Sequence, residues 1–168
     1  MEFGREWLFF FSALGAFNGL ILSFYVFFFA RPRHISNYFL GGLLFSLSLR
    51  IGKSVFFHFN PDLADIYLQI GLVGCFFIGP FLFFYLRSVT NAESWTPRLW
   101  LLHLAFLIPA LTLHLYLYNS QMVAMSWALF INAIYLIWSI YVIAAAKPVK
   151  DILKKTFSKG QTLSFHEI

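Results

Sequence analysis

Charged residues are scarce in this sequence. Asp, Glu, Lys and Arg make up 11% of the 168 residues, whereas hydrophobic residues make up 60% and Phe alone occurs 23 times. A soluble domain carries about 25% charged residues. The chain therefore lacks the polar surface of a water-soluble globular domain, and its composition is typical of a protein that lies in a lipid bilayer.

Cysteine and the common catalytic motifs are also scarce or missing. Cys75 is the single cysteine, which excludes an internal disulfide and a cysteine-based metal site. The sequence contains no HExxH, GxSxG, P-loop or CxxC motif. The histidines are too widely spread to suggest a shared metal ion; they are His34, His58, His103, His114 and His166. We therefore predict no catalytic residue, no metal site and no cofactor, and we do not expect an enzyme.

Long apolar segments account for most of the chain. About 20 helical residues span the ~30 Å hydrocarbon core of a bilayer, and five segments have roughly this length, at about 7–29, 36–59, 63–86, 99–118 and 122–146. We therefore predict an all-α fold, a polytopic transmembrane helical bundle with five membrane-spanning helices over residues 1–146.

Residues 147–168 differ from the apolar segments because they are basic and contain Pro148 and Gly160. We expect the transmembrane helix to end near Ala146 and the rest to form an amphipathic cytoplasmic tail. Its lysines would lie on the anionic membrane surface; they include Lys147, Lys150, Lys154 and Lys155. An ordinary basic flank of the last helix is the alternative.

The basic residues also predict an orientation. Arg31 and Arg33 lie in the first connection, Arg87 and Arg98 flank the third, and five lysines lie in the tail, whereas the second and fourth connections have no Lys or Arg. Connections with Lys and Arg face the cytoplasm in most membrane proteins. The pattern predicts an N-terminus outside and a C-terminus in the cytoplasm. It also accounts for the net charge of +5 without nucleic-acid binding.

Two cations lie inside the second apolar segment. Arg50 and Lys53 would lie about 13 Å and about 9 Å below the outer end of this helix, on one face, at spacing i, i+3. An intramembrane cation costs about 2.5–3.5 kcal/mol and usually faces a bundle interior or a partner. The pair predicts a site for a small polar or anionic ligand, such as a carboxylate or a lipid headgroup.

Other embedded polar residues are candidates for the same site. Gln69 and Asn132 would lie in the same outer half of the membrane, and Asn18 a little deeper. An alternative without a ligand is that Lys53 extends outward and Arg50 pairs with Asp62 or Asp65 in the next turn. For Asn18, a hydrogen bond to a neighbouring helix is a second alternative.

Small residues and prolines are expected to shape the packing of the helices. Gly15 and Gly19 form a GxxxG motif, which allows another helix to approach closely. It predicts either packing within the chain or a homodimer. Pro80 and Pro109 lie inside the third and fourth segments, where each removes one helix hydrogen bond and is expected to kink the helix.

Several short stretches resemble a known family. They are Asn18–Ser23 (NGLILS), Leu49–Ser54 (LRIGKS), Tyr67–Leu72 (YLQIGL) and Gly79–Ser88 (GPFLFFYLRS). Together they resemble the N-terminal membrane region of bacterial AraC-type transcriptional regulators, in which a polytopic sensor of about seven helices precedes a cytoplasmic helix-turn-helix domain. The resemblance implies a sensor in the bacterial inner membrane that passes an envelope or ligand signal to DNA-bound helices.

The sequence departs from this family in two respects. It has five predicted crossings, and no helix-turn-helix follows Lys147, so the resemblance implies a fragment or a shortened form, and no residue here is assigned to DNA. Two other functions are left open. One is a small transporter or channel subunit lined by the same polar residues, and the other is a membrane scaffold without a ligand.

Overall fold

The chain folds into helices only. The structure, a computed structural model, describes residues 2–60, 65–90, 98–119 and 127–159. These residues form α1 (Glu2–Phe28), α2 (Ile35–Phe59), α3 (Asp65–Thr90), α4 (Arg98–Asn119) and α5 (Trp127–Lys159). The described ranges contain no strand, so the all-α prediction is confirmed.

Four helices are long and apolar enough to cross a membrane. Their spans are Glu6–Phe28, Ile35–Phe59, Gln69–Thr90 and Ile131–Lys150. Many large hydrophobic side chains on these helices are exposed on the outside of the molecule, as lipid contact requires. These features identify a membrane protein. In α4 the apolar stretch is shorter, Trp100–Leu113, so the predicted fifth crossing is not established.

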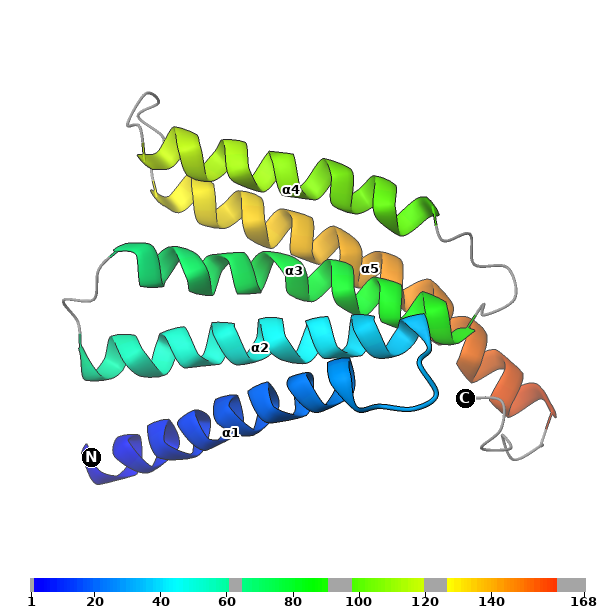
Figure 1. Ribbon diagram of the computed structural model, residues 1–168, viewed down its shortest axis with the longest axis horizontal. Coiled ribbons are helices and arrows are strands. Elements are labelled where there is room, and N and C mark those ends of the chain that lie inside the picture. Colours follow the sequence, from blue (N-terminus) through cyan, green and yellow to red (C-terminus); the bar gives the residue numbers. More distant parts are fainter. Residues whose placement is uncertain (1, 61–64, 91–97, 120–126, 160–168) are drawn as a thin grey trace.

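The helices lie side by side and alternate in direction (Figure 1). Helix α1 lies at one edge, α2 lies between α1 and α3, and α3 packs against both α2 and α5. The α1–α2 connection, the end of α3, the start of α4 and the end of α5 meet at the same end of the array (Figure 1). The basic residues predicted to share one side of the membrane belong to these segments.

Helix α5 is longer than the sequence indicated. We expected the transmembrane helix to end near Ala146 and Pro148 to break the tail, but α5 is one helix that continues through Pro148 to Lys159. An interior proline costs about 3 kcal/mol in a helix. The side chains on this side of α5 are packed inside the molecule: Pro148 is buried and Ala145 is 2% exposed. Burial of apolar atoms offsets part of that cost.

Glycines allow α3 to approach its neighbours closely. A Cβ atom on Gly74 would lie 2.9 Å from the carbonyl oxygen of Ser46 on α2. A Cβ atom on Gly79 would lie 2.9 Å from the carbonyl oxygen of Trp138 on α5. Both neighbours are backbone atoms, which cannot rotate away as a side chain does. The α2–α3 and α3–α5 contacts therefore depend on the absence of a side chain.

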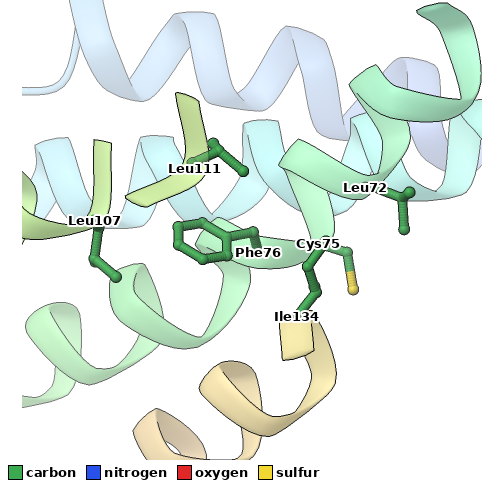
Figure 2. Close-up of a cluster of buried hydrophobic side chains, with 6 residues drawn as sticks. All are labelled: Leu72, Cys75, Phe76, Leu107, Leu111 and Ile134. Atoms are coloured by element: carbon green, nitrogen blue, oxygen red, sulfur yellow. The ribbon is translucent and has the colours of Figure 1, made fainter. Parts of the chain in front are cut away.

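A buried cluster joins α3, α4 and α5 (Figure 2). It consists of Leu72, Cys75 and Phe76 of α3, Leu107 and Leu111 of α4, and Ile134 of α5. Phe76, Leu107 and Ile134 are each 2% exposed. Because these side chains are almost fully buried, they make many dispersion contacts. Such packing contacts contribute to helix association in lipid, where the hydrophobic effect does not act between helices.

Candidate functional site

Arg50 lies where α2, α3 and α5 meet. Its Nη1 donates a hydrogen bond to Oγ of Ser54 at 2.9 Å, and its Nη2 donates to the hydroxyl of Tyr135 on α5 at 3.4 Å. Cys75 of α3 lies near the same guanidinium, and a Cβ atom on Gly74 of α3 would lie 3.5 Å from the backbone nitrogen of Arg50. Arg50 is half-buried, and its hydrogen bonds join α2 to α5 through neutral groups.

Lys53 lies one turn further along the same face of α2. Its side chain passes over Gly71 of α3, where a Cβ atom would overlap the Lys53 methylene groups. Its Nζ lies 5.9 Å from the centre of the Phe57 ring, a distance at which a cation is attracted to the ring face. Gly71 thus provides the space that lets Lys53 stay between α2 and α3.

The two cations have no carboxylate beside them in the described part of the chain. The electrostatic neighbours of Arg50 are Tyr135 and Cys75, and those of Lys53 are Arg50 and Cys75. The predicted alternative, an ion pair of Arg50 with Asp62 or Asp65, lies outside the described residues and side chains. Arg50 and Lys53 repel each other, and no carboxylate among the described side chains offsets their charge.

A guanidinium carries five N–H donors. Arg50 donates to Ser54 and Tyr135, so these two hydrogen bonds leave other guanidinium donors unused among the described groups. The bond to Tyr135 is longer than the usual 2.7–3.2 Å for N–H···O. An oxygen of a carboxylate or phosphate would form a shorter, charge-assisted bond there.

The other predicted ligand residues do not all join this pair. Gln69 is half-buried on α3, two residues before Gly71, and has an interaction of its own. Asn132 is exposed on α5, one turn before Tyr135. Asn18 is exposed on α1, which α2 separates from α3 (Figure 1). The structure therefore places Gln69 and Asn132 on the helices that surround Arg50, and Asn18 on a different face of the molecule.

The two glycines of the GxxxG motif differ in their surroundings. A Cβ atom on Gly19 would overlap the Ser48 hydroxyl of α2, whereas nothing lies within 4 Å of such an atom on Gly15. The α1–α2 contact is continued by a buried hydrogen bond from Ser23 Oγ to the carbonyl oxygen of Gly41, 2.9 Å long. Gly19 therefore lies inside the helix pair and Gly15 outside it.

The two prolines predicted to kink helices differ in burial, and the lysines predicted to lie on the membrane surface are found along the last part of α5. Pro80 is fully buried inside α3, and Pro109 is exposed inside α4. The lysines Lys147, Lys150 and Lys154 are exposed along the last part of α5, and Lys155 belongs to the same helix but its side chain is not described. An apolar groove of about 360 Å³ lies between α3 and this part of α5, with Lys150 in its wall.

Sequence reasoning missed four residues of the Arg50 site, which are Ser54, Gly71, Cys75 and Tyr135. The position of Ser54 at i+4 from Arg50 on one helix was a usable signal. For Cys75 and Tyr135 no local signal existed, since they lie on other helices. A further unpredicted contact joins α4 to α5, where Nδ1 of His103 lies 2.8 Å from the Tyr141 hydroxyl.

The described residues hold no group of three His, Cys, Asp or Glu that could bind a metal ion. Arg50 and Lys53 form a cation pair whose neighbours among the described groups are neutral.

Comparisons of the chain with protein-family models, with curated proteins and with solved structures found no match.

Proposed function

We propose that this chain is a sensory membrane module that binds a small anion at Arg50 and Lys53 and passes the bound state along α5. The observation that carries the proposal is the position of Arg50 between α2, α3 and α5 beside a second cation, with neutral neighbours only among the described groups. An anionic ligand would neutralise the pair and use the donors that the protein leaves over.

The link to the cytoplasm is the helix that carries Tyr135. Helix α5 extends from Trp127 through Pro148 to Lys159, so a displacement at Tyr135 is carried toward its basic end within one continuous helix. An anion that replaces the long bond between Arg50 and Tyr135 would release α5 from α2. A shift of α5 at one end is then transmitted to its other end.

The proposed setting is the bacterial inner membrane. In AraC-type regulators, which the sequence resembles, a membrane sensor acts on a cytoplasmic DNA-binding domain, and we propose this role here. The proposal includes five crossings with the N-terminus outside. The gathering of the basic segments at one end of the array (Figure 1) supports this orientation.

Anion binding can be tested with the purified chain in lipid nanodiscs. The probes are inorganic phosphate, butyrate and a short-chain anionic phospholipid, and the readout is thermal stability. A ligand at a hundred times its Kd stabilises the folded state by about 2.7 kcal/mol. We expect at least one probe to stabilise the unaltered chain and to lose this effect in the Arg50→Met, Lys53→Met double variant.

The matched control is Arg33→Met, which removes an exposed cation from the α1–α2 connection. It should leave the stabilisation unchanged. Equal stabilisation of the unaltered chain and the double variant, or none by any probe, would refute the anion site. Flux of the stabilising anion across vesicles that contain the chain would instead favour the transporter.

A further inference from the structure

The outer face of α1 carries a regular pattern of exposed residues. Leu8, Phe11, Gly15, Asn18, Leu22 and Tyr25 follow one another at alternating spacings of three and four and are all exposed. The four large side chains are exposed to between 54% and 64%. This is the heptad spacing of residues that face a partner helix in a left-handed coiled coil. A second series has the same spacing and is also exposed, namely Phe10, Leu14, Phe17, Ile21, Phe24 and Phe28, so the spacing alone does not select a face, and the first series is distinguished by Asn18. We call the series that contains Asn18 the α1 seam.

The seam is separate from the face by which α1 packs inside the chain. Ala16 and Ser23 are 6% and 0% exposed, and Gly19 faces Ser48 of α2. Only 11% of the α1 span is buried, against 44% of the α3 span. Since α1 lies at the edge of the array (Figure 1), the seam faces outward from the molecule.

Asn18 determines what can cover the seam. It lies near the middle of the span Glu6–Phe28, about 15 Å or more from either end, and its exposed amide forms no hydrogen bond within the described residues. A polar side chain in the hydrocarbon core is costly unless it is hydrogen-bonded, and a lipid tail offers no partner. The covering group must therefore provide a hydrogen-bonding group at mid-membrane depth.

A second copy of the chain meets this requirement. We infer that α1 pairs with α1 of a second copy in a parallel, two-fold arrangement in which the two Asn18 amides hydrogen-bond to each other. An amide has both donors and acceptors, so it is complementary to itself, and two-fold symmetry brings the two Asn18 residues to the same depth. Gly15, with nothing within 4 Å of its Cβ position, lets the two helices approach one turn away.

This inference is independent of the anion site, because the seam contains neither Arg50 nor Lys53. The association is tested with the full chain in lipid vesicles, by energy transfer between donor-labelled and acceptor-labelled copies. Asn18→Leu should weaken self-association by roughly three- to thirtyfold, the range expected for hydrogen bonds between polar side chains in membranes. Asn18→Gln, which keeps an amide, should retain most of it.

The control for a general effect of removing an amide is Asn132→Leu, which alters an exposed Asn of α5 and should leave self-association unchanged. Thermal stability of each variant shows whether the fold is kept. A monomeric unaltered chain at the same density in the membrane, or equal association of the Asn18→Leu variant, would overturn the inference.

The geometry of the pair is tested by disulfide cross-linking in a Cys75→Ala background. Phe11→Cys and Leu22→Cys lie on the seam and should form cross-linked dimers. Phe17→Cys and Phe24→Cys change residues that are also exposed, to 60% and 52%, but lie off the seam, and should not cross-link. The reverse pattern would show that a different face of α1 forms the contact and would contradict the pairing of Asn18.

Discussion

The hydroxyl oxygen of Tyr135 lies 3.4 Å from Nη2 of Arg50, although 85 positions separate the two residues in the chain. This contact joins the helix with the embedded cations to the helix that runs on to the basic end. The distance is longer than the usual 2.7–3.2 Å for N–H···O, so the bond is weak.

Tyr135→Phe removes the hydroxyl and should separate anion binding from signalling. We expect a probe that stabilises the unaltered chain to bind the variant as well, whereas its effect on the end of α5 is lost. The loss of one weak hydrogen bond costs about 0.5–1.5 kcal/mol of stability at most. A spin label at Lys154→Cys reports the motion of α5 on addition of the anion; Cys75 is kept, because it belongs to the site and is buried.

The control for Tyr135→Phe is Tyr116→Phe on α4, which removes a hydroxyl from another exposed tyrosine. It should leave the response of the label intact. An unchanged response in Tyr135→Phe would show that α5 is not coupled to the site through this hydroxyl.

Gly79→Ala should destabilise the α3–α5 contact. The added methyl group would lie 2.9 Å from the carbonyl oxygen of Trp138, and forced repacking of this kind costs about 1–3 kcal/mol. Reversible unfolding in detergent measures the change. Gly52→Ala is the matched control, because nothing lies within 4 Å of its Cβ position and alanine favours a helix over glycine by up to ~1 kcal/mol. Two substitutions of the same kind should thus have opposite signs, and equal effects would contradict the packing described here.

Tyr141→Phe should leave Nδ1 of His103 without its partner and loosen α4 from α5. A fully buried unsatisfied polar group costs about 1–3 kcal/mol, and we expect the lower end of this range because His103 is only partly buried, beside the Phe84 ring at 5.4 Å between ring centres. The double variant with His103→Phe should recover part of the loss, because neither polar group is then left alone. A double-mutant cycle measures the coupling, and strictly additive effects would argue against the bond.

The proposed orientation predicts where labels reach the chain. In a Cys75→Ala background, Arg31→Cys and Lys154→Cys should react with a membrane-impermeant thiol reagent from one side of the bilayer. Asn60→Cys, just after α2, should react from the opposite side. If the labels at 31 and 154 react from different sides, either α4 does not cross or the orientation is wrong.

Local sequence was sufficient for the helices, for the membrane character of the chain and for the cation pair. Apolar runs of about 20 residues have few alternatives in a bilayer, since a helix satisfies its own backbone. Arg50 and Lys53 share a face because they are three residues apart on one helix. The length of α5 was not predicted from the sequence. A proline inside a helix is tolerated when its ring is buried, as it is at Pro148.

Only the tertiary structure decided which side chains meet. A helix that is apolar all round shows no preferred inner face in its sequence, so nothing local distinguishes Gly19, which packs on Ser48, from Gly15, which faces outward. The same holds for Asn18, predicted near the ligand site and found exposed on the outer face of α1. Tyr135 and Gly71 join the site because α3 and α5 approach through glycines. The position of a residue along its helix determines its depth in the membrane, because each residue adds about 1.5 Å. The direction in which its side chain points depends on which neighbouring helices pack against its own helix.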